Sequence, residues 1–434
     1  MLVAGAGLAG LAAARVLEAR GCHVDVIEAR DRVGGRVWTI RDGLAAGQHA
    51  EAGADLIEGD QAALITLARE LRLPREPILR RGFGYYGRDR RGRLSVQALM
   101  RGDHRVWASL GAAGEAYKLG ERRWDSAIAR RLGRTSVAAW LRRLRADAWT
   151  RHRFVGFRGL FLADPDALSM LALVDFFADE PFAGDEGMCR LVGGNDRLAT
   201  AIAADLRQPP QLETILRAVR RNARGVTAVL DDRHGRRSEY RADYLVVALP
   251  ASTARLVRFE PALPDAQHDA IRCLRYGAAT RLLLQCERRF WHRAGRPLAF
   301  GSDQPFGALW DGNEGQAGTP GVLSFLAGGR ASAGLRSILA RGGHAGLLAK
   351  LRWLGKPSSV LASRLVVWEH DPWARGGYAY FDPKFDPLWR AWLARPAGCV
   401  VFAGEHTSHR WQGYMNGAIE SGQRAAAEIV AMMA

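Results

Sequence analysis

Apolar residues at the beginning of the chain follow a pattern typical of a strand, a tight turn, a helix and a second strand. The run Leu2–Ala4 is followed by glycines, then by an alanine-rich stretch, and then by a second apolar run that ends at Glu28. Short apolar runs bounded by turn residues predict buried strands, and an apolar stretch of helical length between them predicts a crossover helix. The pattern therefore predicts a β-α-β unit over residues 2–28.

The glycines of this unit form a G-x-G-x-x-G array, which is typical of dinucleotide binding. Gly5 permits the turn, Gly7 lets the backbone approach a pyrophosphate, and Gly10 lets the helix pack closely on the strand. The first turn of the helix offers free N–H groups to the phosphates. Glu28 ends the second strand, where a carboxylate can accept hydrogen bonds from a ribose. A second glycine turn with a cation, G-G-R at 34–36, follows, and a nicotinamide enzyme has no need of it.

Hydrophobic periodicity predicts further elements along the chain. An amphipathic helix is expected over 62–71, and Pro74 and Pro77 mark the point where the chain leaves the nucleotide-binding part. Residues 78–186 have a mostly helical pattern, with a strand at F-G-Y-Y-G. The other expected elements are a glycine turn and helix over 189–206, three strands at 212–219, 225–230 and 242–250, a strand over 281–291, a helix near 343–354 and a strand at V-V-W-E-H.

The composition is that of an ordinary globular protein. The 434 residues are enough for two domains with a large core, and 48% hydrophobic and 25% charged residues are usual values. No apolar run approaches the ~20 residues of a membrane span and no secretory leader pattern is present, so we expect no membrane association and a cytoplasmic location. The cysteines are widely spaced and form no C-x-x-C, so we expect neither disulfides nor a metal site, and we interpret each cysteine as a small buried hydrophobe. They are Cys22, Cys189, Cys273, Cys286 and Cys399.

The net charge of +17 and the pI of about 10.4 raise nucleic acid or an anionic membrane as partners. The arginines, however, are scattered in ones and twos, as in R-R-G-F-G-Y-Y-G-R-D-R-R-G-R, rather than gathered in one block. We therefore interpret the charge as a solvated basic surface and expect neither partner. Attraction of an anionic substrate or protein stays open as the alternative.

Segments at both ends of the chain resemble one family. The stretches V-A-G-A-G-L-A-G-L-A-A-A, E-A-R-D-R-V-G-G-R-V-W-T and E-A-G-A-D resemble the N-terminal FAD-binding signature of the flavin-containing amine oxidases, the group of monoamine oxidases, polyamine oxidases and L-amino-acid oxidases. Residues 401–424, V-F-A-G-E-H-T-S-H-R-W-Q-G-Y-M-N-G-A-I-E-S-G-Q-R, are similar to the segment with which that family closes over the flavin. The resemblance runs over the whole chain.

The resemblance implies an α/β fold, α+β overall, with two domains that are both discontinuous in sequence. One is a Rossmann-like FAD-binding domain, and the other is a substrate domain of mixed sheet and helices. The FAD-binding domain is expected over 1–75, 187–262 and 397–434, and the substrate domain over 76–186 and 263–396.

FAD is the cofactor that the resemblance implies. In the family, the loop at Gly53 approaches the flavin ring, the strand at Leu216 holds adenine through its backbone, and Glu405 binds the ribityl chain. Gly377 stands where monoamine oxidases have the cysteine that bonds the flavin, so we expect non-covalent FAD. The expected cofactor-binding residues are Gly5, Gly7, Leu8, Ala9, Gly10, Glu28, Ala29, Arg30, Gly35, Arg36, Gly53, Ala54, Leu216, Gly404, Glu405, Gly413, Tyr414 and Met415.

Amine oxidation by a flavin removes a hydride equivalent from the carbon next to nitrogen, so the protein needs mainly to orient the amine and exclude water. In the family an aromatic pair sandwiches the amine, and by the G-G-Y and G-Y-M motifs this pair matches Tyr378 and Tyr414. Trp368 matches a tryptophan beside the flavin. The resemblance implies an oxidoreductase that acts on a small amine or an amino acid, with molecular oxygen as the acceptor.

Arg281 is the point at which the chain departs from the family, which usually has a lysine here that holds a water near flavin N5. Lysine can exchange a proton, whereas arginine stays charged and presents a planar fork. The departure leaves open a dehydrogenase or desaturase on the same scaffold, in which a partner other than oxygen re-oxidises FAD. A flavoprotein that uses FAD structurally is a further alternative. The sequence does not determine the substrate or the oligomeric state, a homo-oligomer included.

Overall fold

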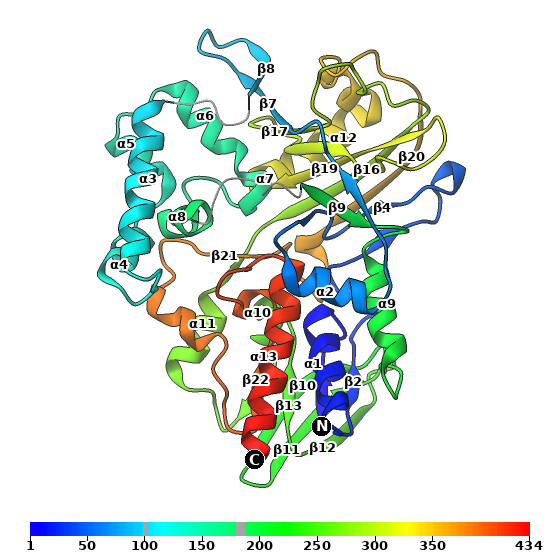
Figure 1. The fold of residues 1–434 in the computed structure, drawn as a ribbon, viewed down its shortest axis with the longest axis vertical. Coiled ribbons are helices and arrows are strands. Elements are labelled where there is room, and N and C mark those ends of the chain that lie inside the picture. Colours follow the sequence, from blue (N-terminus) through cyan, green and yellow to red (C-terminus); the bar gives the residue numbers. More distant parts are fainter. Residues whose placement is uncertain (99–102, 179–186) are drawn as a thin grey trace.

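A computed structural model describes residues 1–98, 103–178 and 187–434. Figure 1 shows an elongated molecule in which the N and C termini lie together at one end. The half that contains the termini combines both ends of the chain with residues around 200–260, whereas the other half is built from the middle segments. Segments far apart in sequence therefore lie side by side.

A parallel sheet forms the centre of the half that contains the termini. Its strands, in spatial order, are β2 (Asp25–Ile27), β1 (Leu2–Ala4), β13 (Leu245–Val247) and β22 (Val400–Phe402). β1 and β13 are buried along their whole length, as their continuous apolar runs predict. This sheet joins the two ends of the sequence in one layer.

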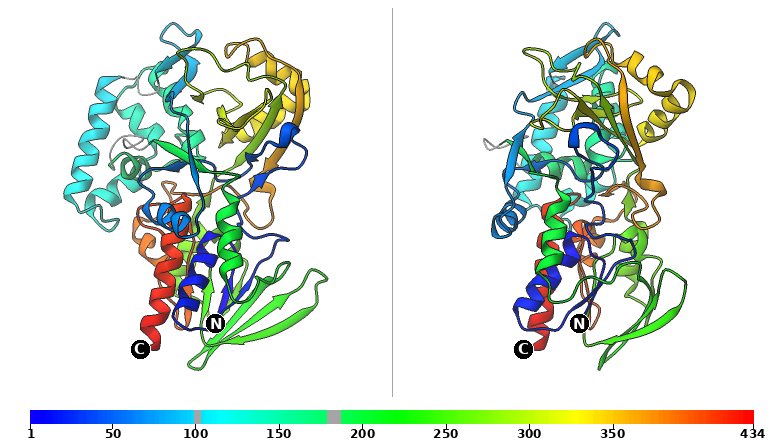
Figure 2. Two further views of the ribbon diagram at one scale, coloured as in Figure 1. Left: turned by 45° about the vertical axis from the view of Figure 1, so that its right-hand side comes forward. Right: turned by 90° about the vertical axis from the view of Figure 1, so that its right-hand side faces the viewer.

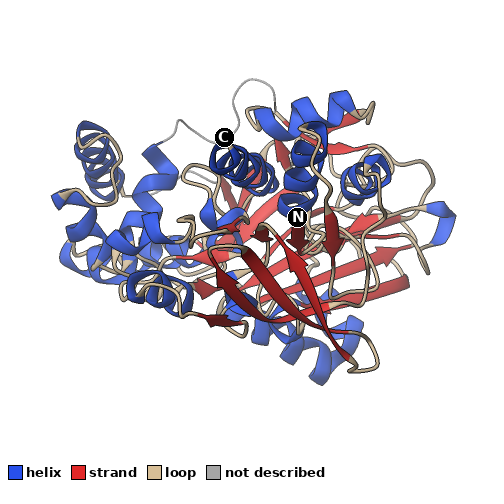
Figure 3. Cartoon of the chain, turned by 90° about the horizontal axis from the view of Figure 1, so that it is seen from below, coloured by secondary structure: helices blue, strands red, loops and turns tan. Residues whose placement is uncertain are grey.

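The helices α1 (Leu8–Ala19) and α13 (Met415–Met433) pack against each other beside this sheet, together with α9 (Asp196–Asp205). A Cβ on Gly422 would lie 2.1 Å from the carbonyl oxygen of Ala9, so the two helix backbones approach closely at this point. Figure 3, seen from below, shows the termini near each other and helices on both sides of the strands.

A mixed sheet adjoins the parallel sheet. Its strands are β12 (Arg237–Ala242), β11 (Gly225–Asp231), β10 (Ile215–Asn222) and β14 (Arg258–Glu260), in that order. β11 is antiparallel to both β10 and β12, and β14 is parallel to β10. The β11–β12 hairpin projects from the body of the molecule in Figure 2. The sequence predicted three strands up to residue 250 and missed β12, because this edge strand is largely exposed and its R-S-E-Y-R-A sequence has no apolar run.

A seven-stranded sheet forms the centre of the other half. Its order is β20 (Val360–Val367), β16 (Ala279–Cys286), β19 (Gly321–Gly328), β18 (Ala308–Asp311), β17 (Ala299–Ser302), β7 (Phe83–Arg88) and β8 (Leu94–Ala98). β16 is buried at every position and confirms that a strand passes through Arg281, but it begins at Ala279 and ends at Cys286, so the expected extension to Trp291 was wrong. The strand at F-G-Y-Y-G is confirmed as β7.

Two predicted elements of this half need correction. The helix expected near 343–354 is α12 (Arg330–Lys350), which begins earlier and kinks at Gly343, where φ is +56°. The strand expected to include V-V-W-E-H ends at Val367, and Trp368 begins a single 3-10 turn, η2 (Trp368–His370). Both elements were predicted from short apolar windows, and the kink lies in the exposed pair Gly342–Gly343, where glycine permits a positive φ.

A lobe of helices covers one side of the seven-stranded sheet, as Figures 1 and 2 show. Its helices are α3 (His104–Leu119), α4 (Ala127–Gly133), α5 (Val137–Arg143), α6 (Ala148–Gly156), α7 (Arg158–Phe161) and α8 (Met170–Ala178). Asp103, Ser126, Ser136 and Asp147 each accept a hydrogen bond from a backbone N–H of the helix that follows, which fixes where these helices begin.

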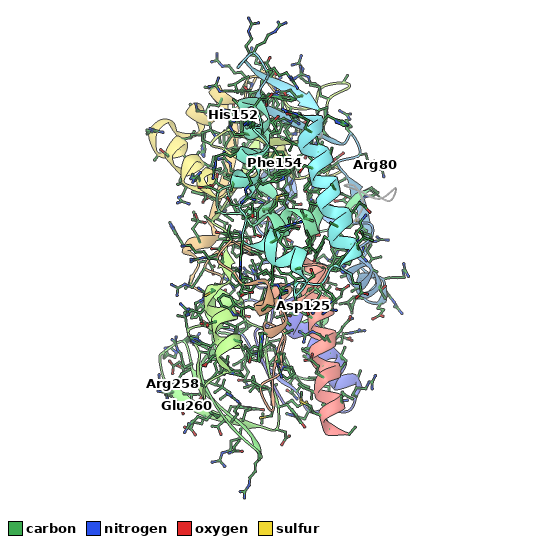
Figure 4. The ribbon with its side chains drawn as sticks, turned by 90° about the vertical axis from the view of Figure 1, so that its left-hand side faces the viewer. Arg80, Asp125, His152, Phe154, Arg258 and Glu260 are labelled. Carbon is green, nitrogen blue, oxygen red and sulfur yellow. The ribbon has the colours of Figure 1, made fainter. Side chains whose placement is uncertain are left out.

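Figure 4 shows His152 and Phe154 of α6 at the opposite end of the molecule from Arg258 and Glu260 of β14. The side chain of His152 is 49% exposed, whereas Phe154 is buried. His104, at the beginning of α3, is exposed as well.

Short elements join the two halves. They are β3 (Thr39–Ile40), η1 (Ala45–Gly47), β4 (Ala50–Glu51), β5 (Ile57–Glu58), α2 (Ala62–Glu70), β6 (Arg75–Ile78), β9 (Met188–Leu191), α10 (Ala251–Ala254), α11 (Asp265–Cys273), β15 (Arg275–Tyr276), β21 (Ala379–Tyr380), η3 (Pro387–Trp392) and η4 (Glu405–Thr407). α2 confirms the predicted amphipathic helix. β9 pairs with both β5 and β6, so the chain crosses between the halves here in three adjacent strands.

Three further expectations concern membrane spans, metal sites and cysteines. In the part of the chain that the structure describes, no helix is long and apolar enough to cross a membrane, and no group of side chains could hold a metal ion. All five cysteines are free. Cys273 and Cys399 are only partly buried, so their interpretation as buried hydrophobes was wrong.

Candidate active site

A cavity of about 580 Å³ opens between the parallel sheet and the seven-stranded sheet. Its wall includes Ala4, at the carboxyl end of β1, and Phe300, on β17 of the other half. The carboxyl edge of a parallel sheet is where ligands bind in folds of this kind. All residues that the sequence predicted for the cofactor or for catalysis lie in this wall except Gly10.

Gly10 lies outside the wall because it packs under the first turn. Gly5 has φ +107°, a conformation that favours glycine, and a Cβ on Gly10 would lie 1.9 Å from the carbonyl oxygen of Gly5. A Cβ on Gly7, by contrast, would meet nothing within 4 Å. Gly10 therefore allows helix and turn to approach each other, and Gly7 leaves open space beside the turn.

Two helix N-termini open into the cavity. Gly7, which has no side chain, precedes α1, and Tyr414, whose side chain makes no capping hydrogen bond, precedes α13. Neither first turn contains an acidic residue. Leu8 and Met415, the first residues of the two helices, both line the wall. Uncapped N–H groups and the partial positive charge of a helix N-terminus favour anionic groups. The cavity is therefore built to hold anionic groups at two places.

Glu28 is buried at the end of β2, beside the glycine turn. Its carboxylate accepts hydrogen bonds from the backbone N–H groups of Ala6, at 2.8 Å, and Arg30, at 2.9 Å. Burial raises the pKa of Glu28, and these two hydrogen bonds oppose the rise. Glu28 thus fixes the glycine turn against β2, and its remaining lone pairs are available to a ribose hydroxyl.

Glu405 connects three segments of the wall. Its Oε1 accepts from Arg36 Nη1 at 2.9 Å and from the N–H of Ala379 at 3.3 Å, and its Oε2 accepts from the N–H of Gly413 at 2.8 Å. Burial alone would raise the pKa of Glu405, but the nearby Arg36 guanidinium lowers it below the ordinary value. A ribityl chain, which is expected to bind Glu405, would have to share a carboxylate that already accepts these three hydrogen bonds from the protein.

Tyr378 and Tyr414 both line the cavity. The hydroxyl of Tyr378 donates to the carbonyl oxygen of Leu160 at 2.6 Å, and that of Tyr414 lies 3.4 Å from Glu58 Oε1. Burial raises the pKa of both phenols, so both rings stay neutral. The hydroxyl contacts fix the positions of two rings that line the cavity.

Trp368 and Gly377 shape the wall near Tyr378. The indole N–H of Trp368 donates to the carbonyl oxygen of Ala52 at 3.0 Å, which holds the buried ring in place. A Cβ on Gly377 would lie 2.4 Å from Leu162 Cδ1 and 3.0 Å from the Cβ of Ala279. A side chain at position 377 would therefore require Leu162 to move.

Arg281 is 2% exposed and is held from three directions. Its Nε donates to the carbonyl oxygen of Glu51 at 2.9 Å, its Nη2 donates to Asp55, and its guanidinium carbon lies 4.5 Å from the centre of the Trp310 ring. Trp310 Nε1 also donates to Asp55 at 2.8 Å, and Arg190 pairs with the same carboxylate. Burial lowers the pKa of Arg281, and Asp55 opposes this. Arg281 is thus a fixed, paired cation in the wall.

Comparison of the sequence with models of protein families identifies a family that is consistent with this fold and site. The model of the family described as "Flavin containing amine oxidoreductase" matches residues 8–430. The chain belongs to this family. Membership makes the protein an oxidoreductase and implies a flavin cofactor.

Several relatives of this amine oxidoreductase align along nearly its whole length. The chain is 30% identical to the putative flavin-containing monoamine oxidase AofH of Mycobacterium tuberculosis, over 100% of this chain and 97% of that protein. The structure superimposes on cyclohexylamine oxidase from Brevibacterium oxydans with a TM-score of 0.88, at 27% identity, covering 100% and 98% of the two chains. It also superimposes on wild-type putrescine oxidase bound to putrescine, with a TM-score of 0.84 at 25% identity, covering 99% and 98%.

The amine oxidoreductase cavity also contains residues to which sequence reasoning assigned no functional role. Asp55 was part of the quoted motif E-A-G-A-D, but its pairing with Arg281 depends on contacts between distant strands. Glu58 and Trp310 belong to no motif. The same holds for the phenylalanines of the wall, which are Phe83, Phe157, Phe161, Phe176, Phe177, Phe300 and Phe381. The clustering of phenylalanine at 154–177 was the one available signal, and it indicates apolar packing as readily as a binding wall.

Replacing Arg281 with methionine is expected to lower the free energy of unfolding by about 3 kcal/mol, because breaking a buried ion pair leaves part of the Asp55 charge uncompensated. The double variant Arg281→Met/Asp55→Asn should lose more, because it also leaves the buried Arg190 cation without its carboxylate. Urea unfolding of the flavin-bound protein measures both values.

Arg15→Met serves as the control, because Arg15 pairs with Glu70 and Asp205 at a partly exposed site. An exposed pair of this kind is worth at most about 1 kcal/mol. Equal losses for Arg281→Met and Arg15→Met would show that Arg281 is not held as described.

Proposed function

We propose that this amine oxidoreductase uses non-covalently bound FAD to oxidise an amine with an apolar, ring-sized body, and that molecular oxygen re-oxidises the cofactor. The proposal rests on the chemistry of the wall around Tyr378 and Tyr414. That wall is largely aromatic, and the arginines of its described part already have carboxylate partners.

The aromatic wall favours an apolar substrate that carries one polar group. Phe157 and Phe161 from the helical lobe, Phe300 from β17 and Trp310 from β18 contribute rings to the same cavity as the two tyrosines. Such surfaces bury apolar groups favourably, and ring faces attract the partial positive charge of an amine. Both solved relatives named above are amine oxidases by their titles, which supports an amine substrate.

The paired arginines disfavour an α-amino acid. A substrate carboxylate in this cavity would need a cation, because burying an unpaired charge is costly. The pairs in the described wall are Arg30–Asp371, Arg36–Glu405, Arg217–Asp231, Arg281–Asp55 and Arg410–Asp60. A carboxylate would have to share a cation whose charge a protein carboxylate already balances, so the amine without a carboxylate is the better ligand.

The residues fit FAD. The uncapped N-terminus of α1 and the cation Arg36 suit a pyrophosphate, Glu28 suits a ribose, and the N-terminus of α13 suits the pyrimidine end of a flavin. We propose that the segments 1–75, 187–262 and 397–434, which supply these groups, form the FAD-binding domain. When bound, FAD supplies the hydride acceptor. Tyr378 and Tyr414 then hold the amine between their ring faces and keep water from the reacting carbon.

We expect the purified protein to release intact FAD when it is denatured. Gly377 offers no thiol for attachment, and a side chain at this position would collide with Leu162. Absorbance of the supernatant and of the precipitated polypeptide measures the partition of flavin. Flavin that stays with the polypeptide would contradict non-covalent binding.

The substrate class can be tested with 2-phenylethylamine and phenylalanine, which share the same body and differ in the carboxylate. The amine should reduce the flavin under anaerobic conditions at least about 100-fold faster, because the amino acid would bury a carboxylate without a free cation. Stopped-flow absorbance measures both rates. Faster reduction by phenylalanine would reverse the assignment to an amino-acid oxidase.

Oxygen uptake by the amine-reduced enzyme tests the proposed acceptor. Reduced flavin that persists in air and is re-oxidised by an electron-accepting dye would favour the dehydrogenase alternative.

Removing either aromatic ring should slow flavin reduction by about 10-fold or more while FAD affinity stays near wild type, because the rings orient the amine. Tyr378→Ala and Tyr414→Ala test this by stopped-flow reduction and FAD titration. Tyr378→Phe is the matched control, since it keeps the ring and loses only the hydroxyl contact with Leu160. Unchanged reduction rates in both alanine variants would exclude the sandwich.

A further inference from the structure

Glu58 differs from the other carboxylates of the cavity wall in its partners. Glu28 accepts two backbone N–H groups, and Asp55 pairs with two buried arginines. Glu405 pairs with the partly buried Arg36, and Asp60 lies 3.9 Å from Arg410. Asp175 interacts electrostatically with Tyr117 and Arg390. Among the described residues, Glu58 has no cation and no backbone donor as its partner. Its recorded contact is the hydroxyl of Tyr414.

The position of Glu58 follows from its strand. It ends β5 and stands opposite Met188 of β9, so an uncharged side chain faces it from the neighbouring strand. Its Oε1 lies 3.4 Å from the hydroxyl of Tyr414, and both residues line the cavity. A carboxylate therefore stands at the hydroxyl end of one of the two rings proposed to hold the amine.

The surroundings of Glu58 bring the pKa of its carboxyl group into the range suited to proton transfer near neutral pH. Burial raises the pKa of Glu58 to about 7, Asp60 acts in the same direction, and the Tyr414 hydroxyl opposes them. These are the titratable groups of the described chain that act on Glu58. The group is only partly buried, so a proton on it can exchange with solvent.

We propose that Glu58 accepts the proton of the substrate ammonium as the amine enters the aromatic part of the cavity. In this step an N–H bond of the ammonium breaks, an O–H bond forms on the Glu58 carboxylate, and the neutral amine remains; no electrons are transferred. The inference rests on the proposed amine substrate.

The transfer is favoured by the cavity itself. A free alkylammonium has a pKa near ~10, similar to lysine, and transfer into apolar surroundings lowers it, whereas burial has raised that of Glu58. The two proton affinities therefore approach each other. A carboxylate in this range is an efficient proton acceptor at neutral pH.

The test follows protons released when the holoenzyme binds 2-phenyl-2-propylamine, an amine with no hydrogen on the carbon next to nitrogen, which therefore cannot be oxidised. Calorimetry in buffers of different ionisation enthalpy counts these protons. Below about pH 7, Glu58 is already protonated, so neutral-amine binding should release about one proton to the buffer. Above about pH 7 the proton should pass to Glu58, and the release should fall toward zero.

In Glu58→Gln the number of protons released on binding should no longer vary with pH. Flavin reduction by 2-phenylethylamine at about pH 8 should also be at least about tenfold slower in this variant. Glu58→Asp keeps a carboxylate and should retain the variation of proton release, displaced in pH. Glu70→Gln, the same substitution at an exposed pair on α2, should behave as wild type.

The outcomes separate the two proposals. Proton release by wild type that does not vary with pH, or a variation that persists in Glu58→Gln, would overturn the role of Glu58 even if amines are good substrates. A holoenzyme that binds neither amine would contradict the proposed function, and the role of Glu58 would fall with it. If the Glu58→Gln protein does not fold, the role of Glu58 is still tested by the pH dependence of proton release in wild type and in Glu58→Asp.

Discussion

The ion pair between the partly buried Arg36 and the buried Glu405 is the contact on which the rest of the cavity depends. It joins residues 369 positions apart at 2.9 Å, and Glu405 also accepts backbone N–H groups beside both Tyr378 and Tyr414. One carboxylate thus sets the second glycine turn and the two loops that carry the aromatic pair. Removing either partner of such a pair leaves an uncompensated buried charge, so cofactor and substrate contacts would be lost together.

The nucleotide-binding end of the site could be predicted from sequence because its contacts depend on the backbone. Gly5 needs a positive φ and Gly10 needs the absence of a Cβ, so only glycine serves at either position. Such requirements leave a fixed spacing in the sequence. The same reasoning explains why β1 and β13 were recognised, since strands buried on both faces have continuous apolar runs.

The substrate end could not be predicted in the same way, because its contacts depend on tertiary position. Asp55 meets Arg281 across 226 positions, and Trp310 joins them from another strand. Glu58 reaches the Tyr414 hydroxyl across 356 positions. None of these pairs needs a particular neighbour in sequence, so no local pattern indicates them. Arg281 was recognised from the sequence as a departure from the family pattern, whereas its pairing with Asp55 is visible only in the fold.

The charge of the whole chain gives little information about the substrate. A net charge of +17 suggests an anionic ligand, and that alternative was open from the sequence. Salt screens such a field over about 8 Å at physiological ionic strength, so groups inside the cavity decide what binds there. In the described wall the arginines are paired with carboxylates, and their fields largely cancel. The groups left to act on a ligand are ring faces and the Glu58 carboxylate, and both favour the cationic end of an amine, against the sign of the protein's overall charge.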